Sequence, residues 1–186
     1  MDTSIMEYTA EDLIAHKFMR AGLLVAKPKF DQNGADLLAF LDVHDGAKFC
    51  RIQCKGRSLV NSSSASMSLP INYVTDGLVV SLFVETGERD KTHLYCFLGS
   101  DIRTNWARTG DDYVLNFTRS RFETDLAPFA FGESKIREIV KAIINVNVVG
   151  EFKVMGHGYA DIALSPLTLR ASGTTGAPPT DATAKG

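Results

Sequence analysis

The sequence lacks the features of several protein classes. It has only three cysteines in 186 residues, Cys50, Cys54 and Cys96. So few cysteines, odd in number and without a CxxC pair, argue against a disulfide framework and a zinc site, and we expect reduced thiols. No apolar run approaches the roughly 18 residues that a membrane-spanning helix needs. The acidic N-terminus has no apolar signal-peptide segment, so we expect a soluble, cytoplasmic protein without a membrane partner.

An excess of positive charge is also missing. Lys and Arg number 20 against 22 Asp and Glu, a formal net charge of -2. Proteins that coat nucleic acid are usually basic, so contact with nucleic acid would need a local patch. There is no internal repeat, and the length fits one domain with a real core. We expect that domain over residues 1–165 and a disordered tail over 166–186, where Thr, Ala, Gly and Pro dominate.

Apolar periodicity and turn signals predict the secondary structure. We expect helices over residues 9–22, 100–106 and 134–145, and strands over 23–26, 36–43, 48–57, 77–84, 93–98, 113–118 and 151–155. Thr9 and Ser134 are the expected helix caps, and Gly22 is the expected stop. Residues 59–68, rich in Ser and Asn, are interpreted as a mobile loop. This order of elements predicts an α/β fold with a central mixed β-sheet flanked by helices.

Polar residues gather on two strands that are expected to be neighbours. Side chains alternate between the faces of a strand, so residues 51, 53 and 55 should face away from residues 50, 52 and 54. Asp36 opens the partner strand, directly after a turn at Gly34. Its carboxylate is therefore expected near Gln53 and Lys55.

Asp36, Gln53 and Lys55 together would suit the hydrolysis of a phosphodiester. Hydrolysis of a phosphodiester requires a hard divalent cation on the phosphate, and carboxylate and carbonyl oxygens are the ligands that such a cation prefers. Asp36 would supply the anionic ligand, and the Gln53 side-chain oxygen or the backbone carbonyl of Cys54 a neutral one. Lys55 would orient or deprotonate the attacking water and offset the charge growing on the phosphate.

Three stretches together resemble a known family. They are the run from Glu11 to Gly22, the triplet Gly34-Ala35-Asp36, and the run from Ile52 to Arg57, Ile-Gln-Cys-Lys-Gly-Arg. In order and element type they resemble the core of PD-(D/E)xK nucleases, most of all the type IV methyl-directed restriction endonucleases and, more distantly, archaeal Holliday-junction resolvases. The resemblance covers roughly residues 7 to 60.

The resemblance implies a restriction-endonuclease-like fold that acts on DNA with Mg²⁺ or Mn²⁺, commonly as a homodimer. By this resemblance, Glu11 corresponds to the acidic residue of the family's first helix, and Asp36 is the principal metal ligand. Gln53 takes the place of the family's second acidic ligand, and Lys55 is the catalytic lysine. Most of the family has Glu or Asp at the position of Gln53, although the methyl-directed branch tolerates Gln. The neutral amide removes one unit of charge from the metal site and should weaken its affinity for Mg²⁺.

Three functions therefore stay open at the level of sequence. The first is a Mg²⁺-dependent endodeoxyribonuclease. The second is a catalytically degenerate domain that keeps the nuclease fold to bind DNA or a protein, for example in conflict between phage and host, and Gln53 favours it. The third is an interaction protein whose loop 59–68 meets a partner.

Basic residues gather near the proposed site. Lys27, Lys29, Arg51 and Arg57 are expected to contact the phosphates of DNA. The alternative is that they form an ordinary solvated surface. Each acid also has an ordinary interpretation, because Asp36 suits a turn and Glu11 suits the start of a helix.

Overall fold

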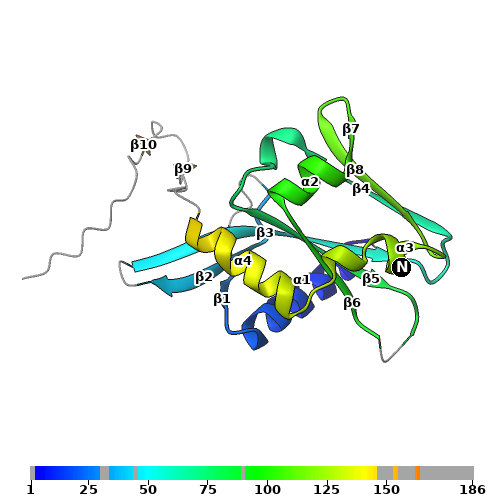
Figure 1. Ribbon diagram of the computed structural model, residues 1–186, viewed down its shortest axis with the longest axis horizontal. Helices are drawn as coiled ribbons and strands as arrows, with labels where there is room; N and C mark the ends of the chain where they lie inside the picture. The colour runs from blue at the N-terminus through cyan, green and yellow to red at the C-terminus, as the bar shows by residue number, and fades with distance from the viewer. Residues whose placement is uncertain are drawn as a thin grey trace, which may run out of the picture. The chain divides into compact units, whose positions relative to one another are not determined.

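The computed structural model describes residues 3–29, 34–43, 46–88, 91–145, 153–154 and 162–163 (Figure 1). The chain forms two compact units, one of residues 1–43 and 47–148 and another of residues 44–46 and 149–186. In the second unit, β9 (Lys153–Val154) pairs antiparallel with β10 (Ile162–Ala163). Residues 166–186 lie outside the described residues, so the expected domain boundary and tail stay predictions.

A five-stranded sheet forms the centre of the first unit, in the order β1-β2-β3-β5-β6. Its strands are β1 (Leu24–Ala26), β2 (Leu37–Val43), β3 (Gly46–Ser58), β5 (Leu78–Glu85) and β6 (His93–Leu98). β3 and β5 run parallel, whereas β1 with β2 and β5 with β6 run antiparallel. The sheet is therefore mixed, and α1 (Thr3–Arg20) and α4 (Glu133–Asn145) cover one of its faces. The predicted α/β class is confirmed.

A second, three-stranded antiparallel sheet lies over the other face. Its order is β4-β8-β7, with β4 (Ser64–Pro70), β8 (Asp112–Thr118) and β7 (Ala107–Thr109). The helices α2 (Gly99–Asn105) and α3 (Phe122–Asp125) pack on the same side, together with the short 3₁₀ turns η1 (Ile71–Tyr73) and η2 (Ala127–Phe129). The sequence analysis did not predict this sheet.

The central strand β5 explains why the molecule has two apolar cores. Val79 packs among the residues beneath α1 and α4, whereas Leu78, Val80 and Leu82 pack among those beneath the second sheet. A strand that is buried on both faces needs apolar side chains at successive positions. The continuous apolar run predicted as a buried central strand is confirmed as such.

The start of each long helix differs from the prediction. α1 begins at Thr3, so Thr9 lies inside the helix and is not its cap. The preceding residues contain no Pro or Gly that would stop a helix from extending in that direction. α4 begins at Glu133, which places Ser134 inside the helix. The stop at Gly22 is confirmed: its φ is 87°, and the Leu23 amide donates back to the Phe18 carbonyl.

The mobile loop predicted for residues 59–68 is wrong over its second half. Residues 64–68 belong to β4, which pairs along its whole length with β8. Met67 and Leu69 are buried, whereas Ser64, Ser66 and Ser68 are exposed. The serines therefore form the solvent face of a two-sided strand and do not mark a loop.

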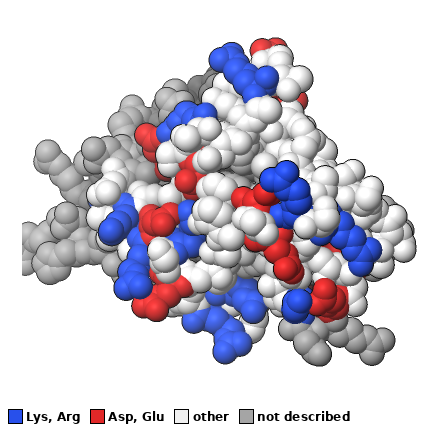
Figure 2. Space-filling model, turned by 45° about the vertical axis from the view of Figure 1, so that its right-hand side comes forward, with Lys and Arg blue, Asp and Glu red and all other residues white. Residues whose placement is uncertain are grey.

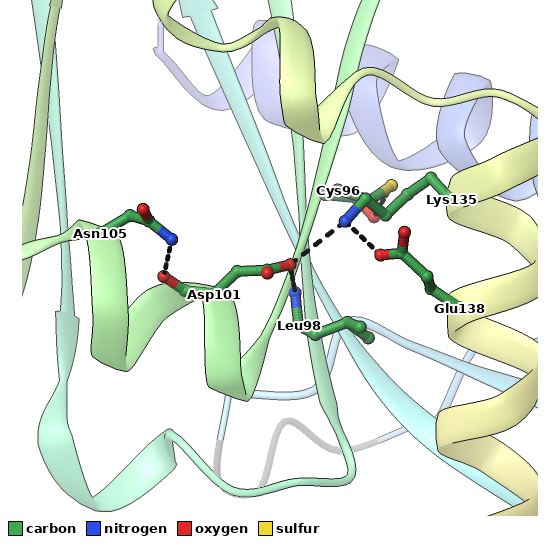
Figure 3. Close-up of polar contacts among 7 residues, drawn as sticks. Cys96, Leu98, Asp101, Asn105, Lys135 and Glu138 are labelled. Carbon is green, nitrogen blue, oxygen red and sulfur yellow. Dashed lines mark hydrogen bonds and ion pairs between the residues drawn. The ribbon is translucent and has the colours of Figure 1, made fainter.

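An ion cluster around the buried Lys135 joins α2 to α4 (Figure 3). The Lys135 ammonium on α4 lies 2.6 Å from a Glu138 oxygen and 3.3 Å from an Asp101 oxygen on α2. Asp101 also accepts from the Leu98 amide at 2.9 Å. Burial alone would lower the pKa of Lys135, but the hydrogen bond to Glu138 and the charges of Asp101 and Glu138 raise it overall.

No helix in the described part of the chain is long and apolar enough to cross a membrane.

Candidate functional site

Strand β3 presents two of the predicted site residues on one face. Gln53 pairs in register with Val80 and Lys55 with Leu82, and both β5 residues face the second sheet. Cys54 lies on the opposite face, in the core beneath α1 and α4. The predicted alternation along β3 is therefore confirmed. Gln53 is only 6% exposed, whereas Lys55 is partly exposed.

Asp36 is fixed against β3 just before β2 begins. Its backbone amide donates to the Ile52 carbonyl at 2.9 Å. Its carboxylate oxygen Oδ2 accepts from the Gln53 side-chain amide at 3.0 Å and from the Cys54 backbone amide at 2.6 Å. The carboxylate thus contacts Gln53, whose side chain lies on the same face of β3 as Lys55.

Glu11 reaches the same region from α1. Its carboxylate forms an ion pair with Lys27, which follows β1. Burial is the main reason why the pKa of the Cys54 thiol is raised, and the charges of Asp36 and Glu11 raise it further. Of the two carboxylates, that of Asp36 also accepts a hydrogen bond from the Cys54 backbone amide. Whether Glu11 and Asp36 act together stays a prediction.

Lys55 is less closely tied to this group. Among the described residues, no ion pair is found between Lys55 and a carboxylate. Lys55 therefore shares a strand and a face with Gln53 but forms no ion pair with Asp36 in the part of the chain that the structure describes. A lysine that is not committed to a carboxylate keeps its charge available for a substrate phosphate.

The available metal ligands are few and all are oxygens. Within the described ranges, no three His, Cys, Asp or Glu side chains converge as a metal-binding group would. The Cys54 thiol is buried beneath the helices, so Cys54 could contribute only its backbone carbonyl. The carboxylate of Asp36, the amide oxygen of Gln53 and this carbonyl suit a hard cation such as Mg²⁺. A set with one anionic member should bind it weakly.

Tyr73 is a neighbour of the site that the sequence analysis missed. Gly34 has a φ of 68°, and a Cβ added there would lie 2.7 Å from a Tyr73 ring carbon and closer still to the Gln53 side-chain oxygen. Gly34, Gln53 and Tyr73 therefore pack together without spare room. Tyr73 comes to the site through η1, directly after β4, so predicting its position would have required the second sheet.

The arginines expected to bind DNA already hold the strands together. Arg51 donates to the Tyr73 carbonyl at 3.3 Å and to the Thr75 hydroxyl at 2.9 Å. Arg57 donates to the Ser66 carbonyl at 2.8 Å and to the Gly56 carbonyl at 2.7 Å. Lys29 is exposed, and Lys27 pairs with Glu11. Contact of these four residues with DNA stays a prediction.

Replacing Gly34 with alanine should destabilise the protein more than the same change at Gly110. Both glycines have positive φ, but nothing lies within 4 Å of a Cβ at Gly110. Gly110→Ala should cost about 1–2 kcal/mol from backbone strain alone. Gly34→Ala adds the collision with Gln53 and Tyr73, and we expect at least about 1 kcal/mol more. Denaturant unfolding measures both, and equal losses would contradict the packing described at Gly34.

Comparisons with known proteins give structural matches only. No protein-family profile matches the sequence, and no curated protein matches it. The structure is similar to that of a bacterial homing endonuclease, I-Ssp6803I, with 16% sequence identity, a TM-score of 0.49 and coverage of 76% of this chain and 94% of that one. It is also similar to Hjc, a Holliday junction resolvase from Archaeoglobus fulgidus, an archaeal hyperthermophile, with 8% identity, a TM-score of 0.43 and coverage of 71% and 95%. These similarities concern the fold of the chain.

Proposed function

We propose that the protein is a metal-dependent endodeoxyribonuclease that uses Mg²⁺ or Mn²⁺. One observation carries the proposal: the Asp36 carboxylate is hydrogen-bonded to Gln53 and to the Cys54 amide, on the strand that presents Lys55 on the same face as Gln53. An acid and a neutral oxygen ligand are thereby in contact, and a lysine lies two residues along the same face of β3. Metal-dependent phosphodiester hydrolysis can use this combination.

Each residue has a distinct role in this proposal. Asp36 would hold the cation together with the Gln53 oxygen or the Cys54 carbonyl, and a bound divalent cation would polarise the phosphate and acidify a water. Lys55 would position that water and balance the charge developing on the phosphate. Glu11, which is paired with Lys27, would supply additional negative charge next to the cation. A homodimer would let two such sites cut two strands.

A binding-only domain is the second candidate function. Its support is the neutral side chain at Gln53, which donates to Asp36 and brings no charge to a cation. The described residues also lack a convergent group of three metal-binding side chains. Such a protein would bind DNA without cutting it.

Cleavage of supercoiled plasmid separates the two candidates. The nuclease should convert supercoiled DNA to nicked or linear DNA in Mg²⁺ or Mn²⁺ and should stop when EDTA removes the metal. Binding without cleavage in either metal would favour the second candidate. Equal cleavage with and without EDTA would exclude the proposed metal mechanism and point to a contaminating nuclease.

Replacing Gln53 with glutamate should make the thermal stability of the protein depend on a bound divalent cation. The Gln53 amide nitrogen lies 3.0 Å from the Asp36 carboxylate, so Gln53→Glu would place two carboxylates in contact. Without metal their repulsion should lower the melting temperature, and a divalent cation should restore it. We expect at least about tenfold tighter Mg²⁺ binding than in the wild type, measured as a metal-induced thermal shift. The control Gln53→Leu removes the hydrogen bond to Asp36 without adding charge, so a divalent cation should not raise its melting temperature in the same way. An equal metal-induced rise in both variants would show that the metal binds away from Gln53.

A further inference from the structure

Strand β4 is joined directly to the candidate site. Arg57 lies two residues after Lys55 on β3, about 7 Å along the same face, and its guanidinium donates to the Ser66 carbonyl in the middle of β4. The far end of β4 leads through η1 to Tyr73, which packs against Gly34 beside Gln53. β4 is therefore linked to the candidate site at two points, and its solvent face is turned away from β3.

The solvent face of β4 and β8 consists mainly of small, uncharged polar side chains. Ser64 pairs with Thr118, Ser66 with Asn116 and Ser68 with Val114, and all of these residues except the partly buried Val114 are exposed. The segment from residue 58 to 75 contains no Asp or Glu. Small hydroxyl and amide groups offer donors and acceptors to base edges, and they let the sheet come close to a duplex.

Arginines border this face where β8 ends. Arg119 and Arg121 are exposed, and Arg121 lines a shallow pocket of about 350 Å³ together with Ser64, Ser66, Asn116, Thr118 and Asp125. Arg121 pairs with Asp125 at 3.0 Å, and Arg119 donates to the Val60 carbonyl at 3.1 Å. Exposed guanidinium groups can turn towards phosphates. Figure 2 shows positive and negative side chains interspersed on the visible side of the molecule, with no extended basic area there.

We propose that the exposed face of β4 and β8 is a surface for double-stranded DNA, on which Ser66 and Asn116 contact base edges and Arg119 and Arg121 contact phosphates. This places DNA recognition on the second sheet and not on Arg51 and Arg57, whose guanidinium groups hold β3 to the segments around β4. The proposal rests on the proposed nuclease for its choice of ligand. It does not require that the protein cuts.

The test is binding of a labelled duplex of about 20 base pairs in EDTA, so that cleavage does not enter the measurement. Ser66→Glu and Asn116→Asp each place a carboxylate on the proposed face, at exposed positions where folding should not be affected. We expect each to raise the dissociation constant at least about tenfold at fixed salt. Ser134→Glu adds the same charge on α4, on the other side of the central sheet, and should change the constant by less than about twofold. Melting temperatures confirm that all three variants fold.

The possible outcomes test the proposed DNA surface and the proposed nuclease activity independently. If the wild type fails to bind duplex, or if Ser66→Glu and Asn116→Asp bind as well as Ser134→Glu, the surface is refuted. A change of oligomeric state in Ser66→Glu, seen by size-exclusion chromatography, would instead make the face a contact between copies of the chain and would also refute it. A wild type that binds through this face but never cuts would refute the nuclease alone. If the Ser66→Glu variant cleaves DNA as fast as the wild type, the proposed DNA surface is refuted but the proposed nuclease is not.

Discussion

Replacing Lys135 with alanine is expected to be one of the most destabilising single changes in the chain. The Lys135 side chain is 5% exposed and holds Asp101 and Glu138 within ion-pair distance (Figure 3). Removing one partner of a fully buried pair costs about 3–5 kcal/mol, and we expect about 2–3 kcal/mol here because water reaches the Glu138 carboxylate. Denaturant unfolding measures this loss.

Two controls separate charge from packing at Lys135. Lys135→Met keeps an apolar stem next to Phe129, over whose ring the ammonium lies at 5.5 Å. It should recover part of the stability lost in Lys135→Ala. Arg137→Ala removes an exposed ion pair with Glu133 on the same helix and should cost less than about 1 kcal/mol. A loss in Lys135→Ala no larger than in Arg137→Ala would show that the buried cluster contributes little.

Replacing Lys55 with alanine is expected to slow DNA cleavage by at least about 100-fold, the effect of removing a group that acts on the transition state. DNA affinity should fall less than about tenfold, because only one positive charge is lost. Lys55 is partly exposed and forms no ion pair among the described residues, so the fold should tolerate the change. Single-turnover cleavage and duplex binding, measured on the same preparation, separate the two effects.

The control for Lys55 is Lys141→Ala, which removes an exposed lysine from α4. It should leave the cleavage rate within about twofold of the wild type. A fall in DNA affinity as large as the fall in cleavage rate would make Lys55 a DNA contact and not a catalytic residue.

The sequence predicted those parts of the molecule whose patterns are local. Alternation along β3 placed Gln53 and Lys55 on one face, and the continuous apolar run predicted β5 as a strand buried on both sides. The turn at Gly34 placed Asp36 at the start of the neighbouring strand, where its amide bonds to Ile52. Each of these inferences depends on residues close together in the chain.

The parts that were missed depend on contacts between distant segments. β4 was interpreted as a loop because it is rich in serine, although Ala65, Met67 and Leu69 alternate with those serines. Its partner strand β8 also lies far along the chain, so the pairing could not be predicted from local sequence. Without β4, the approach of Tyr73 to Gly34 could not be foreseen. The attachment of Arg57 to Ser66 was hidden for the same reason. The start of α1 was misplaced because Thr9 suits a cap but no local feature ends the helix before it, whereas the predicted start of α4 at Ser134 was only one residue late.

The central claim is that the carboxylate of Asp36 holds the metal for DNA hydrolysis. The most direct measurement is the Mg²⁺-dependent cleavage rate of Asp36→Asn, which keeps the size of the side chain and removes its charge. We predict a rate at least about 100-fold below that of the wild type, with the protein folded and still bound to duplex DNA. An Asp36→Asn protein that cuts supercoiled DNA as fast as the wild type would contradict the claim.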